Sequence, residues 1–333
     1  CPQFVRWGFA SSRAYGKLAA ELKELSGIDT GYAPTGGIIP CLGEAELEAR
    51  AQFIEKLRAE TEDGTYPASV LSRKELEGML PKVPFGPEVS GGIWSDMDGY
   101  VDPLHLMFAF RKSFVRLGGT LFAGERVSEV KPSGKGYTVV CGGRTLECGK
   151  AVLAAGLGVR KLAAQLGTDI PVFPNKSQVM LLERIPADVL PIPLLGIART
   201  FGGTVMIGAA HENMGMDRRL TPEVLAANAQ WAVRVWPELE RKRILRFWTG
   251  LRVWPKDAYP IYDRIPGHEN AFVFAMHSAV SLAAILEQAL PDYVMGKPLP
   301  PDGAIFGLSR FAGGGSGFQG SAASSPHAEA PNK

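Results

Sequence analysis

The chain has 333 residues, of which 46% are hydrophobic, so it can bury the core of one large domain or of two smaller ones. Its 36 Lys and Arg residues and 34 Asp and Glu residues give a formal net charge of +2, which excludes binding of nucleic acid or an anionic membrane through overall charge. No apolar stretch is long enough to cross a bilayer, and the sequence therefore predicts a soluble, cytoplasmic protein.

Two segments near the start have apolar residues at three- and four-residue spacing, which predicts packing helices over residues 12–25 and 44–60. Glycine and proline then become frequent, and residues 64–103 are expected to form short strands and loops. Asp102-Pro103 is typical of a helix start, because proline in the first turn loses no hydrogen bond. The helix expected from there to Leu117 is apolar on most sides, which favours its burial between layers.

After Gly118-Gly119 the apolar residues alternate with polar ones, as they do in strands. Residues 151–156 (AVLAAG) are almost entirely apolar and end in glycine, which is typical of a buried central strand, and a helix is expected over residues 159–166. The alternation itself predicts four short strands joined by tight turns: residues 120–122, 126–131, 137–141 and 144–148.

The last part of the chain returns to a mixture of strands and helices, with no internal repeat. Its tail is rich in Gly, Ser and Pro, so residues 312–333 are expected to be a flexible extension outside the fold. The mixed order favours two interleaved sheets over one parallel dinucleotide-binding unit. The predicted strands are residues 177–183, 204–209, 245–254 and 271–275, and the predicted helices are residues 222–236 and 280–295.

Four cysteines, Cys1, Cys41, Cys141 and Cys148, lack the close CxxC pairing and nearby histidine that a structural zinc site uses. We therefore expect reduced thiols and no metal site. The sequence opens with Cys1 in place of Met and passes directly into helical sequence, so we expect a truncated or processed start.

Four segments, taken in order, carry a resemblance to a known family. The first two are residues 91–104 (GGIWSDMDGYVDPL), and residues 126–130 (RVSEV) followed by residues 151–156. The third is residues 247–252 (FWTGLR) with residues 256–261 (KDAYPI), and the fourth is residues 275–282 (AMHSAVSL). Together they resemble the D-amino-acid oxidase superfamily of FAD-dependent oxidoreductases, particularly its glycine oxidase, hydrogen cyanide synthase and opine oxidase branch.

The resemblance implies an α/β fold with an α+β substrate domain, in which a glutathione-reductase-type FAD-binding sheet, here incomplete, is interleaved with an antiparallel substrate-binding sheet. Residues 1–118 are then mainly substrate domain with packing helices, and residues 119–170 are the meander and central strand of the FAD domain. Residues 171–246 hold the substrate-domain sheet and helix, residues 247–311 the return strands and C-terminal helix of the FAD domain, and residues 312–333 the tail.

The resemblance also implies the site residues. Arg252 would pair with the substrate carboxylate, a task that suits the planar, permanently charged guanidinium, although a structural salt bridge is the alternative for an arginine in an apolar strand. His277 would hydrogen-bond near the flavin ring, and the last helix would direct the positive end of its dipole at the ring. The residues expected to contact FAD are Val127, Ala155, Gly156, Gly250, Met276, His277, Ser278, Ala279, Val280 and Ser281.

Several departures from the family pattern affect these expectations. The family begins with a strand, a GxGxxG turn, a helix and an acidic residue for the ribose, and this succession, which holds the pyrophosphate, is not found here. Ala279, Ala284 and Ser177 stand where the family has glycine, proline and glycine, and an added methyl group beside a tightly fitted ring can clash. Leu195 stands near the position of an active-site tyrosine, so the substrate cannot be copied from relatives.

Two functions remain open. As an enzyme, the protein would oxidise the C–N bond of a small amino or imino acid, with hydride transfer to the flavin and hydrolysis of the imine. Alternatively, it is a truncated, flavin-free structural subunit of a hetero-oligomeric amino-acid or opine oxidase. An NAD-dependent dehydrogenase is a weaker third interpretation, because no nicotinamide fingerprint is present. Expected partners are a small amino-acid or opine-like substrate and a second subunit, without nucleic acid or a membrane span.

Overall fold

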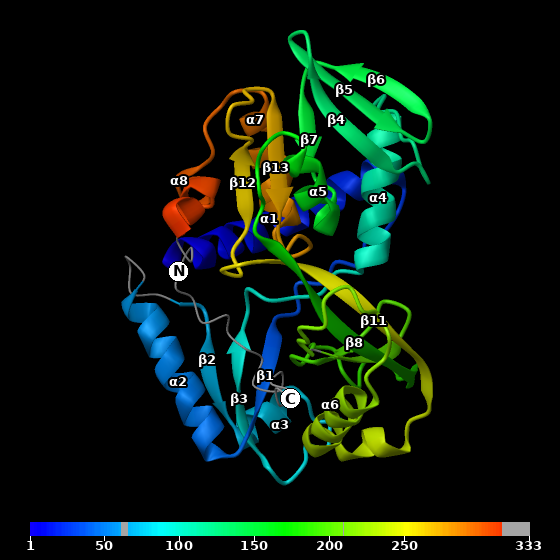
Figure 1. Ribbon diagram of the computed structural model, residues 1–333. Helices are drawn as coiled ribbons and strands as arrows, with labels where there is room; N and C mark the ends of the chain where they lie inside the picture. The colour runs from blue at the N-terminus through cyan, green and yellow to red at the C-terminus, as the bar shows by residue number, and fades with distance from the viewer. Residues whose placement is uncertain (61–65, 209, 315–333) are drawn as a thin grey trace.

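The computed structural model describes residues 1–60, 66–208 and 210–314, and its elements form two regions joined by two long strands, β8 and β11 (Figure 1). One region, drawn at the top of Figure 1, contains a small sheet, a meander and the helices around them. The other region contains a larger sheet, whose named strands pair antiparallel, with helices on its faces.

The small sheet of the first region has the strand order β12-β13-β7, with β12 antiparallel and β7 parallel to the central strand β13. Its bounds are β7 (Ala151–Leu153), β12 (Ile261–Arg264) and β13 (Ala271–Ala275). Because β7 and β13 run in the same direction, with Ala271 opposite Ala151, their carboxyl ends lie at the same edge of the sheet. A separate antiparallel meander consists of β4 (Val127–Ser133), β5 (Gly136–Cys141) and β6 (Arg144–Cys148).

Three helices of the first region pack side by side, because α1 contacts both α4 and α7. Asp102 caps α4 by accepting hydrogen bonds from the backbone N–H groups of Leu104 and His105, the side-chain cap expected at a helix start. The helices are α1 (Pro2–Ser26), α4 (Pro103–Arg116), α5 (Val159–Ala164), α7 (Ala283–Val294) and α8 (Pro301–Ala304), with 3-10 turns at η1 (Gly156–Gly158) and η3 (Leu308–Gly314).

The second region contains two sets of strands, in the orders β11-β8-β10-β9 and β1-β3-β2. Single bridges from Leu194 to Ile197 and to Ile38 connect the two sets into one continuous surface. The strands are β1 (Gly37–Leu42), β2 (Ser69–Ser72), β3 (Val89–Ser95), β8 (Val172–Arg184), β9 (Ile197–Arg199), β10 (Thr204–Gly208) and β11 (Ile244–Pro255).

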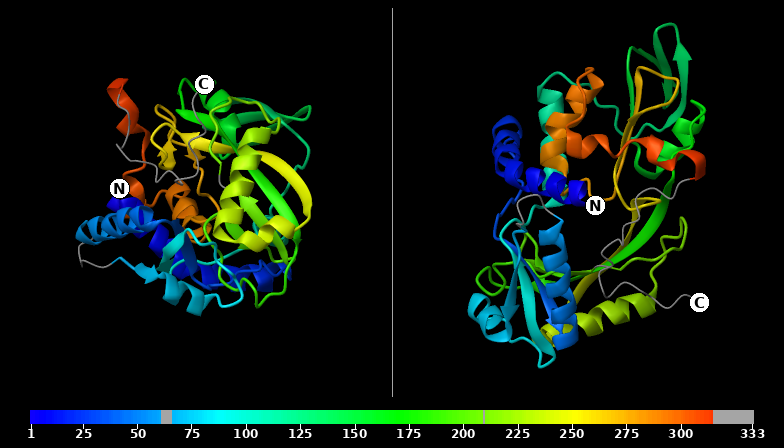
Figure 2. Two further views of the ribbon diagram at one scale, coloured as in Figure 1. Left: turned by 90° about the horizontal axis from the view of Figure 1, so that it is seen from below. Right: turned by 90° about the vertical axis from the view of Figure 1, so that its left-hand side faces the viewer.

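Helices cover this larger sheet, and α6 lies across β8, β10 and β1 (Figure 2). The short helix α3 begins with a capping box, in which the Ser72 hydroxyl and the Glu75 carboxylate each bond the backbone N–H group of the other residue. The helices are α2 (Glu44–Ala59), α3 (Arg73–Met79) and α6 (Pro222–Val235), with a 3-10 turn at η2 (Pro237–Arg241).

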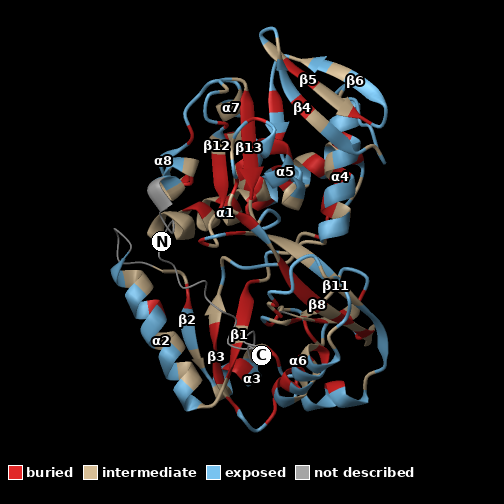
Figure 3. Cartoon of the chain, viewed as in Figure 1, coloured by how far each residue is buried: buried red, intermediate tan, exposed pale blue. Residues whose placement is uncertain are grey.

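Buried residues are concentrated on the central strands of both regions (Figure 3). One apolar cluster joins Ile38, Met180 and Trp236 between the larger sheet and its helices. A second lies around Val273 and Leu153 in the small sheet, and a third joins Phe272 to Leu286 of α7. The small sheet and α7 therefore share a core, which fixes the loop between them.

Most long elements agree with the sequence-based expectations. The helices predicted over residues 44–60, 159–166 and 222–236 and the strands predicted over residues 245–254 and 271–275 are confirmed to within two residues. The first helix is longer than predicted and begins at Pro2. The sequence did not predict four short elements: helix α3 and strands β1, β9 and β12. Segments of this length are too short to show a clear periodicity.

Four expectations need correction. Residues 151–156 are not a buried central strand: β7 ends at Leu153, lies at the edge of its sheet among the described strands, and leaves Val152 44% exposed. Residues 120–122 are not a strand, and the helix predicted over residues 280–295 begins at Ala283, so that residues 280–282 belong to the preceding turn. Helix α4 is not buried between layers: Leu104 is 61% exposed, and other apolar side chains of α4 are also exposed to solvent. Apolar composition alone does not distinguish a buried helix from one that carries an exposed apolar face.

The division predicted from the sequence assigns the paired strands β8 and most of β11 to different domains. Residues 247–255, assigned from the sequence to the cofactor unit, pair with β8 along their whole length as part of β11. Most of the predicted tail, from residue 315 on, and the last residue of the strand predicted over residues 204–209 lie outside the described residues; residues 312–314 belong to η3. In the described ranges, no helix has both the length and the apolar character needed to span a bilayer.

Replacing Phe272 with alanine should lower the free energy of unfolding by about 3–5 kcal/mol, because this fully buried ring of β13 fills the core shared with α7. Chemical denaturation measures the change. The matched control is Phe108→Ala on α4, whose side chain is 45% exposed and whose loss should cost below about 1 kcal/mol. Equal losses for the two variants would contradict the assigned core.

Candidate active site

The centre of the candidate site is Arg252, on the face of β11 that also carries Gly250 and Trp254. In the ladder between β11 and β8, Arg252 lies opposite Asn175 and Gly250 lies opposite Ser177. Paired residues of adjacent strands project to the same face, and this register brings the two polar side chains of β8 to the guanidinium. Arg252 donates through Nη2 to Ser177 Oγ at 2.8 Å and through Nη1 to Asn175 Oδ1 at 3.2 Å.

The Arg252 guanidinium is surrounded by neutral acceptors. Nη1 also donates to the Ala210 carbonyl at 2.8 Å and lies 3.1 Å from His211 Nδ1. In the described ranges of the chain, no carboxylate lies within ion-pair distance of this side chain. Burial lowers the pKa of Arg252, but a guanidinium stays protonated in proteins, so the positive charge persists and can attract an anion.

His211 shares this environment and is neutral. Its Nδ1 lies 2.9 Å from Asn175 Oδ1, and its ring meets Trp254 edge-on, with centroids 5.2 Å apart. Burial, and then the charges of Arg252 and His277, lower the pKa of His211 to about 4. A neutral imidazole therefore stands beside the fixed charge at neutral pH.

Trp254 connects Arg252 to the loop that follows β13. Its indole stacks on the His277 ring, with centroids 4.5 Å apart and an interplanar angle of 23°. His277 Nε2 lies 3.1 Å from the Ala258 carbonyl, and burial lowers the pKa of His277. Ala258 has φ 65°, in the left-handed region that favours glycine. The guanidinium and the predicted flavin loop therefore converge on one wall.

The loop between β13 and α7 is the second part of the site. It joins a fully buried strand to a helix that starts at Ala283, yet Ala279, Val280 and Ser281 are exposed. Helix α1 holds this loop from behind, because Tyr15 donates to the Val280 carbonyl and Ser11 donates to the Ser281 carbonyl at 2.8 Å. Such an exposed loop at the carboxyl end of a central strand is where α/β sheets bind ligands.

The carboxyl end of β7 lies at the same edge. Gly156 has φ 57°, which only glycine adopts at little cost, and its α-carbon faces the side chain of Val253, the neighbour of Arg252 in β11. Ala155 is exposed just before it. Gly156, Arg252 and the loop after β13 are therefore neighbours in space.

A cavity of about 590 Å³ opens beside this loop. Its wall includes Val280, Ser281, the N-terminal half of α1 and residues 96–101, with Tyr15 and Tyr32 among the aromatic side chains. The volume lies within the range of roughly 300–1,000 Å³ found for cofactor and ligand pockets. The residues that line this cavity include Val280 and Ser281 of the loop expected to contact the flavin, but not Arg252 or His277.

The structure brings together some of the predicted site residues and leaves others apart. Arg252 and His277 lie at one wall, and Met276 accepts a hydrogen bond at Sδ from Tyr262 beside it. Gly250 is exposed, with open space where a side chain would begin, and Val127 is exposed at the start of β4. Neither is among the residues that hydrogen-bond Arg252, and both remain predicted FAD contacts.

Sequence reasoning missed the residues that hold Arg252. Asn175, His211 and Trp254 were not singled out, and Ser177 was noted only as a departure from glycine. One signal was present: residues 175–178 (NKSQ) are four polar residues in a row inside an apolar strand, and buried polar groups need partners. The positions of His211 and Trp254 depend on strand pairing, which local sequence does not encode.

Comparisons with known proteins agree on one family. The sequence profile of the family described as "DAO: FAD dependent oxidoreductase" matches residues 3–286. The chain is 32% identical over 311 residues to the B subunit of opine oxidase from Agrobacterium tumefaciens (strain Ach5), which spans 93% of this chain and 83% of that protein. It is 25% identical over 303 residues to glycine oxidase of Geobacillus kaustophilus (strain HTA426), which spans 89% of this chain and 79% of that protein.

The fold is also shared with a solved structure. The crystal structure of glycine oxidase from Geobacillus kaustophilus aligns with a TM-score of 0.82 and 24% identity, covering 90% of this chain and 81% of that chain. The chain therefore shares its mixed α/β architecture with several small sheets with that glycine oxidase.

Acid should destabilise the protein partly through His211. Above pH 6.5 the imidazole is neutral in both states, but between pH 6.5 and about pH 4 the unfolded chain takes up a proton that the folded chain does not. The free energy of unfolding should therefore fall more steeply over this range in the wild type than in His211→Asn. Urea denaturation at a series of pH values measures both slopes, and identical slopes would contradict the assigned environment.

Proposed function

The chain belongs to the DAO family of FAD-dependent oxidoreductases, and from this premise we propose that it oxidises the C–N bond of a small amino or imino acid whose carboxylate is held by Arg252. The resemblance read from the four sequence segments is thereby confirmed at the level of the family. The reaction, the substrate and the roles of individual residues are the content of the proposal.

One observation supports the proposal. The partly buried guanidinium of Arg252 has no ion-pair partner in the described part of the chain, and it lies beside Trp254, which stacks on His277 of the predicted flavin loop. Removing a charge from water is unfavourable unless it is paired. A substrate carboxylate accepting two parallel hydrogen bonds would supply that pair and fix the substrate's orientation. Neutral Asn175, Ser177 and His211 leave the anion without a competing negative charge.

The residues present fit the ring end of FAD. Residues 279–281 would lie along the ring, and the first turn of α7, which has no side-chain cap, would favour negative charge on it. When bound, FAD supplies the acceptor for the hydride that leaves the substrate's α-carbon. The protein's part is orientation and electrostatics, in which Arg252 holds the carboxylate and the Trp254–His277 stack forms one wall of the site.

The proton balance requires no catalytic acid or base from the chain if the amine binds in its neutral form. Loss of hydride from carbon leaves a protonated imine, which water then hydrolyses to the keto acid and ammonia or an amine. The absence of a carboxylate near Arg252, within the described ranges, agrees with a neutral amine, because a bound ammonium group would face a fixed positive charge.

A second candidate function is that of a flavin-free subunit in a hetero-oligomeric oxidase. The similarity to the B subunit of opine oxidase motivates it. In this case the fold would provide packing surfaces to a partner protein, and Arg252 would have no turnover to support.

The substitution Arg252→Ala in the FAD-loaded protein should raise KM for a carboxylate substrate by about 10- to 100-fold, because two charge-assisted hydrogen bonds are lost. The flavin absorbance should be unchanged. Steady-state kinetics measure the effect, and the matched control is Arg246→Ala, an exposed arginine of the same strand. Equal KM values for the two variants would remove Arg252 from the substrate site.

Purified protein should carry FAD, seen as flavin absorbance that persists through desalting and as free FAD released on denaturation. This test separates the two candidate functions, because the structural-subunit hypothesis requires a colourless protein. Reconstitution with added FAD is part of the same experiment, and protein that stays colourless after reconstitution would favour the flavin-free subunit.

A further inference from the structure

The segment after β10 approaches Arg252 through an irregularity in strand pairing. Gly208 pairs with Val179, and pairing with β8 resumes where Glu212 lies opposite Lys176, so four steps along one strand match three along the other. On this segment, one more residue therefore lies between the two pairs than on β8. The Ala210 carbonyl and the His211 imidazole face Arg252, while the next residue, Glu212, faces the opposite side of β8.

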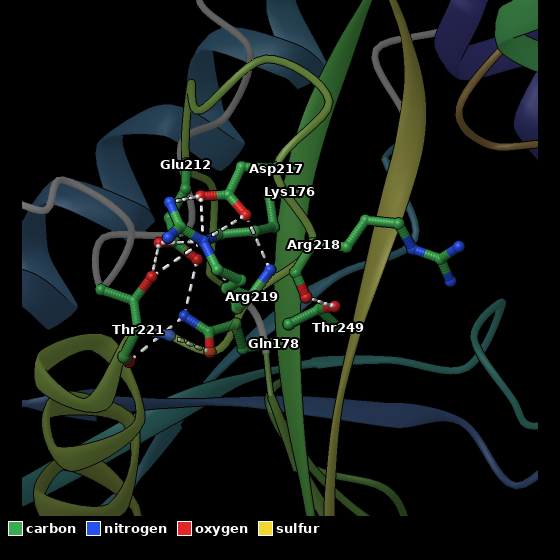
Figure 4. A network of polar contacts seen from close by, with 8 residues as sticks. All are labelled: Lys176, Gln178, Glu212, Asp217, Arg218, Arg219, Thr221 and Thr249. Atoms are coloured by element: carbon green, nitrogen blue, oxygen red, sulfur yellow. Dashed lines mark hydrogen bonds and ion pairs between the residues drawn. The ribbon is translucent and has the colours of Figure 1, made fainter.

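That opposite side holds a buried polar network (Figure 4). Lys176 is 1% exposed, and its Nζ lies 3.2 Å from Glu212 Oε2 and donates to Thr221 Oγ1 at 2.7 Å. Gln178 donates through Nε2 to Glu212 Oε1 at 2.7 Å, and Thr221 Oγ1 donates to Glu212 Oε2 at 2.7 Å. Both oxygens of the carboxylate and the ammonium group are therefore satisfied inside the protein.

The network closes a loop. The Lys176 ammonium group also donates to the Arg219 carbonyl, and the Thr221 N–H donates to Gln178 Oε1, so both ends of residues 212–221 are attached to β8. Thr249 of β11 donates to the Arg218 carbonyl on the same side (Figure 4). Successive residues of β8 thus serve two sites: Asn175 and Ser177 hold Arg252 on one face, and Lys176 and Gln178 hold this segment on the other.

A buried ion pair adds little net stability, but separating its partners is strongly destabilising because it leaves a buried charge unpaired. Shifting the segment by one residue would leave Lys176 charged and unpaired in the core and would turn Glu212 toward Arg252. The pair therefore opposes a slip that the irregular pairing after β10 would otherwise permit.

We propose that the buried Lys176–Glu212 pair fixes the register of residues 210–221 on β8 and so holds Ala210 and His211 against Arg252. Lys176 and Glu212 are positioning residues, and His211 is the specificity-determining residue beside the carboxylate-binding charge. Only this last assignment rests on the proposed function. His211 presents a neutral hydrogen-bonding group to the part of the substrate next to its carboxylate, and the substrate class is a carboxylic acid with a hydrogen-bonding substituent at that place.

The test replaces both partners with apolar residues, Lys176→Met with Glu212→Leu, because removing one partner alone leaves a buried charge and threatens folding. NMR titration of the His211 ring, assigned with His211→Asn, reports its surroundings without requiring turnover. The pKa should rise from about 4 toward 6.5 as the imidazole leaves Arg252 and meets water. A folded double variant whose His211 pKa stays at about 4 would overturn the proposal.

Three further variants sharpen the result. Thr221→Val keeps the ion pair but removes its hydroxyl bridge, so it should move the His211 pKa in the same direction by less, and it tests the proposal if the double variant does not fold. Lys176→Arg keeps a cation opposite Glu212, so its His211 pKa should stay near the wild-type value and below that of the double variant. Glu183→Gln, on the same strand but pairing with Lys242 and Arg243 at the surface, is the control and should change nothing.

Turnover separates this proposal from the proposed function. In FAD-loaded protein with measurable activity, the double variant and His211→Asn should raise KM and alter the preference among carboxylate substrates more than they lower kcat. If KM and substrate preference are unchanged in both variants, His211 does not determine specificity. The positioning role of Lys176 and Glu212 is then tested by the NMR titration alone. If the wild type shows no turnover with any carboxylate, the proposed function fails and the register argument is decided by NMR alone.

Discussion

The site depends on the uncompensated charge of Arg252, which forms no ion pair with a carboxylate of residues 1–60, 66–208 or 210–314. Its guanidinium is partly buried and held by Asn175, Ser177, His211 and the Ala210 carbonyl, all of them neutral. Neutral acceptors orient the side chain but leave its charge uncompensated, and a low-dielectric setting strengthens its attraction for an anion. The strand register, the irregular pairing after β10 and the Trp254 wall all serve to keep this charge available.

The two faces of β8 show the contrast directly. On one face Lys176 is fully paired with Glu212, and the network binds a loop. On the other face Arg252 lacks such a partner in the described part of the chain, and Trp254 of the same strand face stacks on His277 in the loop after β13. The Lys176–Glu212 pair is structural because each charge neutralises the other. The unpaired charge of Arg252, next to the predicted cofactor loop, is suited to binding an anion.

The sequence was informative where local pattern and motif decide the outcome. Periodicity located the long helices and β13, and the motif around Arg252 and His277 identified two residues that the fold does bring to one wall. It failed where long-range pairing decides: the exposed face of α4 reads as core, and His211 reaches Arg252 only because of an irregularity between strands. Ser177, noted from the sequence as a departure from the family's glycine, accepts a hydrogen bond from Arg252.

The most direct measurement of the central claim is a crystal structure of the FAD-loaded protein with a carboxylate that cannot be oxidised. We expect two parallel hydrogen bonds of about 2.7–2.9 Å from Arg252 to the carboxylate, with the ligand's α-carbon facing a flavin that lies along residues 279–281. A ligand bound elsewhere, with Arg252 still occupied by Asn175, Ser177 and the Ala210 carbonyl, would contradict it.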